Sequence, residues 1–139
     1  MTPTKQVLLD ARRLYSGLIR LHILHHAEKE GIFGLGMIEE LARHGYKLSP
    51  GTLYPILHGL EENGLLRSHE QGIGGKIRRV YRATSAGEKL LMAAKEKVRE
   101  LFGELFEDED VTHLPRTRSR VVALQAANHR KPSAKKAAL

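Results

Sequence analysis

Two helix breakers and several small polar residues are concentrated in SPGTLYPILHG, residues 49–59, between regularly spaced apolar positions. The N-terminus of a helix carries free amide groups and a partial positive charge, so a phosphate group is favoured there. Because the first residues of this segment are small, a phosphodiester backbone could approach such a helix end closely. The segment could therefore contact nucleic-acid phosphates or base edges. The candidate side chains are Ser49, Pro50, Thr52, Tyr54 and His58.

A second group of candidates is basic and lies in and just before IRRVYRA, residues 77–83. This run and LLRSHE, residues 65–70, are predicted to be the strands of a hairpin, joined by QGIGGK, whose glycines allow positive φ angles. Side chains alternate between the two faces of a strand, so at most one of two neighbouring arginines shares a face with a given lysine. The candidates for contacts with a phosphate backbone or a minor groove are Lys76, Arg78 and Arg79.

The spacing of apolar residues predicts helices that position these candidates. The expected helices cover residues 7–30, 35–44 and 50–63, and a fourth begins at residue 85. In the third helix, Pro50 fits the first helical position, and the Ser49 side chain could accept a hydrogen bond from an amide of the first turn. Pro55 removes one hydrogen bond inside this helix, which predicts a loosened first turn that faces solvent.

The fourth helix carries more apolar surface than a hairpin could cover. Ser85 and Glu88 have the spacing of a capping box at its start. Its apolar stripe is too short for a stable coiled coil alone, so we expect it to pack with the first helix of a second subunit. The residues predicted to form this dimer contact are Leu91, Ala94, Val98, Leu101, Phe102 and Leu105.

The net charge of +7 is confined to one end of the chain. Residues 1–114 hold 16 Lys and Arg against 16 Asp and Glu, whereas residues 115–139 hold 7 basic residues and no acidic residue. The body is therefore not a uniformly basic nucleic-acid binder, and any such function must come from a local patch. Two interpretations of the tail stay open: a disordered, solubilising end, or an arm that binds phosphates without sequence preference.

Several classes of protein are disfavoured by composition and motif. The chain has no cysteine, which excludes disulfides and thiolate metal sites, and no apolar run approaches the length of a membrane helix. GIGGK lacks the first glycine and the final Ser or Thr of a phosphate-binding loop, and no nucleophile motif is present. We expect a soluble, cytoplasmic protein that is not an enzyme and needs no cofactor.

Histidines in the first helix suggest a different chemistry. His22 and His26 are one helical turn apart, a spacing that suits two imidazole ligands of a metal ion. Two ligands do not complete a site, and no Glu-rich partner stands at a fixed spacing from them. The alternative is that these histidines pack within the fold or at a dimer contact.

The chain contains the motifs LSPGTLYPILHGLEENGLL, KIRRVYRATSAGEKLL and FGLGMIEEL. These motifs resemble those of the PadR family of bacterial transcriptional regulators, and the resemblance covers about residues 14–105. It implies a homodimeric DNA-binding repressor that is usually released from its operator by a small effector. The element order of three helices, a hairpin and a helix is also that of a winged helix-turn-helix.

The predicted fold is mainly α with a small β hairpin. Residues 1–84 are expected to form a winged helix-turn-helix domain that includes the N-terminal helix, residues 85–110 a dimerisation helix, and residues 111–139 a basic, flexible tail. The predicted function is regulation of transcription by a homodimer on a palindromic operator of double-stranded DNA, with an unknown effector. The alternatives are a winged helix that binds only protein and a metal-responsive regulator.

Overall fold

The computed structural model describes residues 2–109 of the chain, and this part consists of four helices and one β-hairpin. The elements are α1 (Lys5–Lys29), α2 (Gly34–Arg43), α3 (Pro50–Glu62), β1 (Leu66–Ile73), β2 (Lys76–Ala83) and α4 (Ser85–Leu105). The prediction of a mainly α chain with a small hairpin is confirmed, in the predicted order. The basic tail predicted at residues 111–139 lies outside the described residues.

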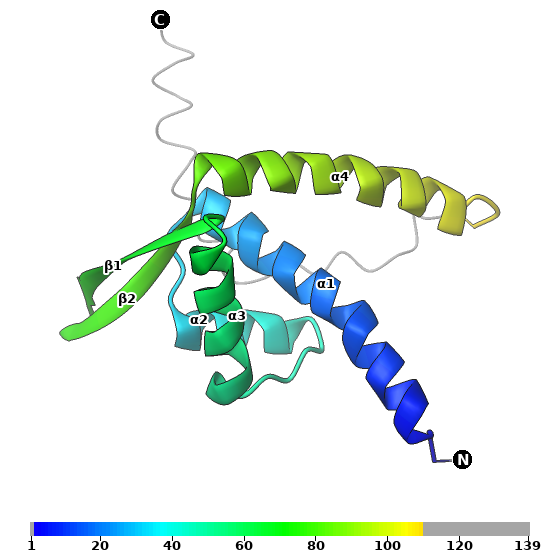
Figure 1. Ribbon diagram of the computed structural model, residues 1–139, viewed down its shortest axis with the longest axis horizontal. Helices are drawn as coiled ribbons and strands as arrows, with labels where there is room; N and C mark the ends of the chain where they lie inside the picture. Colours follow the sequence, from blue (N-terminus) through cyan, green and yellow to red (C-terminus); the bar gives the residue numbers. More distant parts are fainter. Residues whose placement is uncertain (1, 110–139) are drawn as a thin grey trace, which may run out of the picture.

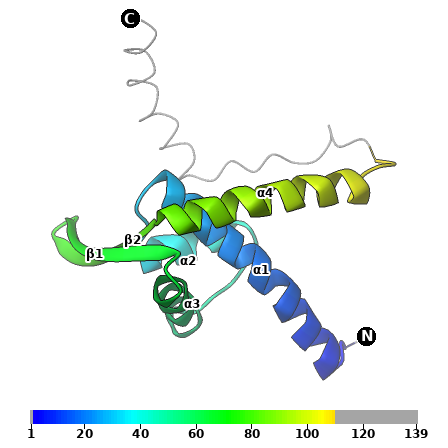
Figure 2. The ribbon, with the colours of Figure 1, turned by 45° about the horizontal axis from the view of Figure 1, so that its top comes forward.

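The two long helices, α1 and α4, diverge from a common body. Figure 1 shows the N-terminal half of α1 and the C-terminal half of α4 extending to one side, and the turned view in Figure 2 shows the same divergence. The hairpin projects from the opposite side of the body, beside the C-terminal end of α3. The fold therefore separates two projecting helices from a compact part that holds α2, α3 and the hairpin.

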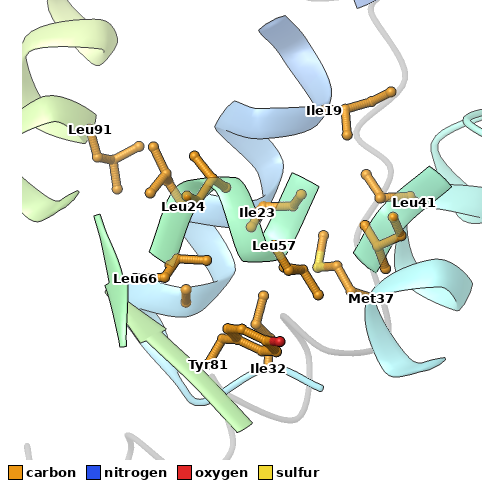
Figure 3. Packing of buried hydrophobic residues seen from close by; sticks show 13 residues of the cluster. Ile19, Ile23, Leu24, Ile32, Met37, Leu41, Leu57, Leu66, Tyr81 and Leu91 are labelled. Atoms are coloured by element: carbon orange, nitrogen blue, oxygen red, sulfur yellow. The ribbon is translucent and has the colours of Figure 1, made fainter. Parts of the chain in front are cut away.

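A single apolar cluster joins all these elements (Figure 3). Ile23 and Leu24 of α1 lie at its centre, between Leu57 of α3 and Leu66 of β1. In α3, the apolar positions expected to face inward are buried, except that Ile56 is half-buried. Tyr81 of β2 is also fully buried, so the hairpin is anchored in the same core. This packing fixes which face of α3 remains open to solvent.

Two helix starts differ from their predicted capping. The prediction that the Ser49 side chain caps α3 is wrong, because its Oγ lies 3.3 Å from the hydroxyl oxygen of Thr52 and caps no amide. Pro50 does occupy the first turn, as predicted. At α4, Thr84 is the N-cap in place of Ser85: its Oγ1 accepts a hydrogen bond from the Gly87 amide at 3.1 Å. The same hydroxyl donates a hydrogen bond to the backbone carbonyl of Gly64. The N-cap of α4 is therefore one position earlier than predicted.

The hairpin is longer than predicted, because only Gly74 and Gly75 form its turn, with φ angles of 59° and 79°. Two-residue turns with positive φ at both positions match the natural twist of paired strands. Ile32, in the connection between α1 and α2, pairs with Tyr81 through hydrogen bonds of 2.9 and 2.7 Å. The hairpin is therefore bonded directly to the end of α1.

Gly87 is required by a close contact at the start of α4. A Cβ added there would overlap the backbone carbonyl oxygen of Leu65, which cannot rotate away. We expect Gly87→Ala to lower the free energy of unfolding by about 2 kcal/mol through this overlap. Gly103→Ala is the matched control in the same helix, because an added Cβ there meets no atom within 4 Å. The control should stabilise by about 0.5 kcal/mol, and urea unfolding of both variants measures the difference. Equal stabilities would contradict the contact.

Candidate nucleic-acid interface

The open face of α3 carries most of the predicted contacts of this helix. Thr52, Pro55 and His58 are exposed, while Leu53 and Leu57, on the opposite face, are buried. Ser49 and Pro50 are exposed at the N-terminal end. Pro55 has no N–H to donate to the carbonyl of Gly51, four residues earlier, and because Gly51 is exposed, no buried group is left without a partner. The helix breakers therefore stand on the open face, as the sequence predicted.

Tyr54 is placed differently from its neighbours. Its side chain is half-buried and packs against the core, and its ring lies against Gly34 at the start of α2. A Cβ on Gly34 would overlap the Tyr54 hydroxyl and ring. The Tyr54 ring therefore holds α3 against α2, and its ring centre lies 6.3 Å from that of His58. Packing of Tyr54 was one interpretation of the sequence, but with the hairpin as the partner, whereas its ring lies against α2.

The two faces of the hairpin differ in charge. On the face toward α3, Arg79 is bound to the hairpin itself, by a 3.6 Å ion pair with Glu70 and a 3.1 Å hydrogen bond to Ser68. Ser68 in turn donates to Glu61 of α3 from its amide, at 2.6 Å, and from its hydroxyl, at 2.9 Å. Arg79 is therefore partly neutralised on the α3 side.

The opposite face of the hairpin holds cations without a carboxylate. The register places Lys76, Arg78 and the pair Arg67 and Arg82 on this face, with no Asp or Glu of either strand. The prediction that only one of the two adjacent arginines shares a face with Lys76 is confirmed, and it is Arg78. Sequence reasoning missed Arg67 and Arg82, although the alternation from Lys76 would have identified Arg82. We call these four residues the basic wing face.

Arg78 also has a defined position within the basic wing face. Its guanidinium carbon lies 5.3 Å from the centre of the Phe33 ring, at the start of α2, which is the distance of a cation–π contact. The contact leaves the guanidinium charged and orders its side chain. Lys76, at the end of the hairpin, is exposed, and no ion pair involves it in the part of the chain that is described.

The histidines of α1 pack between α1 and α2. The rings of His22 and His26 are 6.5 Å apart, and His22 stacks at 4.6 Å on His44, which directly follows α2. His26 is buried, and its Nε2 lies 3.5 Å from Oε1 of Glu40. Among residues 2–109, no three or more His, Asp or Glu side chains are grouped to hold a metal ion. The stacking of His22 on His44 and the contact of buried His26 with Glu40 give these histidines a packing role.

Burial changes the ionisation of His26. Desolvation lowers the pKa of His26 to about 4, and the charges of neighbouring histidines act in the same direction. The carboxylate of Glu40 raises this pKa, but by less than burial lowers it. His26 is therefore neutral at pH 7 and can be a hydrogen-bond acceptor as well as a donor.

An apolar surface on the projecting helices is left exposed by the other elements of residues 2–109. On α4, Leu101 is 52% exposed and Leu105 is 61% exposed, and Val98 and Phe102 are also exposed. Ala94 is half-buried, whereas Leu91 is only 3% exposed, so Leu91 packs inside its own chain. Leu14, Tyr15 and Leu18 are the exposed apolar side chains in the middle of α1. None of the helices in the described part is long and apolar enough to cross a membrane.

The sequence is similar to that of known regulators. Residues 23–93 match the family described as the Transcriptional regulator PadR-like family. The chain is 48% identical over 94 residues to Transcriptional regulator Rv3488 of Mycobacterium tuberculosis, and this match covers 68% of this chain and 88% of that protein.

The fold is similar to that of solved structures. A PadR family transcriptional regulator from Eggerthella lenta is 31% identical, with a TM-score of 0.58, over 75% of this chain and 92% of the other. A PadR-like transcriptional regulator from Bacillus cereus has a TM-score of 0.61 over 70% of this chain and 99% of the other. Its identity is 24%, so that likeness concerns the fold alone.

Proposed function

Because this chain belongs to the PadR-like family of transcriptional regulators, we propose that it is a homodimeric repressor that binds a palindromic operator and leaves it when a small effector binds. The family consists of regulators of transcription and not of enzymes. The observation that carries the proposal is the open face of α3 beside a hairpin whose strands place four basic residues, and no Asp or Glu of their own, on the basic wing face.

In this proposal α3 enters the major groove and the hairpin touches the adjacent backbone. Thr52 and His58 are exposed on α3 and can reach bases or phosphates, while the small residues at its start allow close approach. Lys76 and Arg78 supply the positive charge that the neutral body otherwise lacks. Tyr54 contributes by holding α3 on α2, and its hydroxyl is a further candidate contact.

The proposed dimer brings two α3 helices to one operator. The exposed apolar residues of α4, with those of α1, are the surface that a second copy would cover. Two recognition helices about 34 Å apart fit successive major grooves on one side of a duplex. A palindromic operator then follows from the two-fold symmetry of the dimer. An effector can release the dimer only to the extent that it prefers the non-binding state.

The double variant Lys76→Ala/Arg78→Ala tests the role of the wing. We expect its affinity for the operator to fall by about tenfold or more, and the slope of log affinity against log salt to decrease by about 2 per subunit, because two phosphate contacts are lost. Binding would be measured by fluorescence anisotropy over a salt series, on the operator selected from genomic fragments that the wild-type protein retains.

A matched control separates the effect of the wing contacts on DNA binding from the effect of the total charge. Lys89→Ala/Lys97→Ala removes the same charge from exposed positions of α4 and should leave the salt slope unchanged. Equal slopes for both variants would contradict the wing contacts. If the wild-type protein retained no DNA fragment, the alternative of a winged helix that binds only protein, suggested by the neutral charge of residues 1–114, would be favoured.

A further inference from the structure

A cavity of about 600 Å³ lies between the hairpin and α2. Its lining comes from the end of α1, the connection to α2, α2 itself and both strands of the hairpin. Cavities of a few hundred to about 1,000 Å³ are the usual size of sites for small molecules. This cavity is separate from the open face of α3 and from the apolar surface of the projecting helices, and its lining includes Arg82 of the basic wing face.

One side of the cavity is apolar and held in place. Ile32, Phe33, Met37 and Val80 line it. The Phe33 ring is fixed between Arg78 and Gly36, where an added Cβ would lie only 3.1 Å from the ring. Ile32 is fixed by its backbone pairing with β2. The cavity therefore offers a preformed wall for an apolar body of aromatic size.

His26, one of the residues that line the cavity, carries a buried ring nitrogen without a hydrogen-bond partner among the described residues. This residue is only 2% exposed, and the nitrogen is its Nδ1. Because Nε2 faces the Glu40 carboxylate at 3.5 Å, the proton of the neutral ring belongs on Nε2. Nδ1 is then a lone-pair acceptor, and a buried acceptor without a partner is uncommon.

The charges around the cavity also favour a donor. Glu30 and Glu39 line it, are exposed, and form no ion pair within residues 2–109. The carboxylate of Glu40 is matched by Arg43 at 2.9 Å. Arg82 also lines the cavity, and no ion pair within residues 2–109 includes it. Besides the paired Glu40 and Arg43, the lining therefore holds two carboxylates, one imidazole and one guanidinium.

We propose that this cavity binds a small organic cation, with an apolar body against Phe33 and Met37 and a protonated amine toward Glu30, Glu39 and His26. An ammonium group supplies three N–H donors and a positive charge, which match the carboxylates of Glu30 and Glu39 and the acceptor of His26. An anionic ligand of the same shape would meet two carboxylates. The site thus selects by charge as well as by shape.

The test uses two probes that share a phenyl ring and a short chain: 2-phenylethylamine, a cation, and 3-phenylpropanoate, an anion. Each is titrated into the full chain, and the methyl signals of Met37 and Ile32 are followed by NMR. We expect saturable shifts at both methyl groups with the amine and none with the acid. No DNA is present, so the result does not depend on the proposed regulatory function. Equal binding of the two probes, or no saturable shift, would overturn the proposal.

A double variant locates the amine. Glu30→Gln/Glu39→Gln keeps the size of both exposed side chains, and should weaken binding of the amine by about tenfold. Glu62→Gln/Glu88→Gln makes the same charge change at exposed positions that do not line the cavity, and should keep the wild-type affinity. If the two double variants bind the amine equally, the assignment of Glu30 and Glu39 is wrong.

Discussion

Replacing Glu40 with alanine is expected to lower the free energy of unfolding by about 3 kcal/mol, because it removes a buried carboxylate and leaves its cationic partner without a counter-charge. Glu40 is 1% exposed, although it is an acidic residue on a helix of only ten residues. Its two oxygens face Arg43 at 2.9 Å, His44 at 3.2 Å and His26 at 3.5 Å. In the variant these nitrogens would face the empty space left by the Glu40 side chain. Because a domain is only marginally stable, it has little reserve against this loss of free energy of unfolding.

Glu39 supplies the control for this prediction, since it is the preceding residue of the same helix and is exposed. Glu39→Ala removes the same side chain and charge, and should change the stability by less than about 0.5 kcal/mol. Urea unfolding at pH 7, followed by circular dichroism, measures both variants. Similar stabilities of the two variants would show that the buried carboxylate contributes nothing net to the fold.

The contrast between Glu39 and Glu40 shows what sequence reasoning could not reach. Both residues lie in FGLGMIEEL, and the apolar period of α2 does not mark either as buried. Glu40 is drawn inward because α1 presents His26 to it, from a part of the chain fourteen positions earlier. The same contact explains why His26 is a packing residue, when spacing alone suggested a metal ligand.

Local signals were sufficient where the structure depends on local contacts. The period of Leu53, Leu57 and Leu60 predicted the buried face of α3, and hence its open face. Gly45 and Gly64, which stand just after α2 and α3, have positive φ angles, the backbone conformation that favours glycine at a helix end. In contrast, the capping of α4 by Thr84 depends on a carbonyl twenty residues away, so the capping box at Ser85 was a wrong prediction.

In the candidate interface too, some features could be predicted from residue spacing and others could not. Exposure of Thr52 and His58 follows from helical period, and the separation of Arg78 from Arg79 follows from strand alternation. The packing of Tyr54 on Gly34 and of Arg78 on Phe33 required knowledge of how α2 sits against the other elements. Placement across elements decides which side chains stay available to a nucleic acid, and sequence periodicity does not report it.

The variant Leu101→Glu/Leu105→Glu is expected to be a folded monomer, and its affinity for the operator is expected to be lower than that of the wild type by about 100-fold or more. Both side chains are more than half exposed in one chain, at 52% and 61%, so charges there need not disturb the protomer. In the proposed dimer they would be buried against a second copy, where unpaired carboxylates are costly. Loss of the second subunit removes the effective concentration that links two half-sites, which accounts for a loss of this size.

Sedimentation equilibrium gives the mass of the variant, and anisotropy on the full operator and on a half-site gives its affinities. Met92→Glu/Ala93→Glu places two charges at exposed positions of the same helix off the apolar stripe, and should remain dimeric with the affinity of the wild type. Should the Leu101 and Leu105 variant stay dimeric, the subunits would have to meet through another surface. A monomer with undiminished affinity for the full operator would mean that one winged helix suffices, because linkage between half-sites would then contribute nothing.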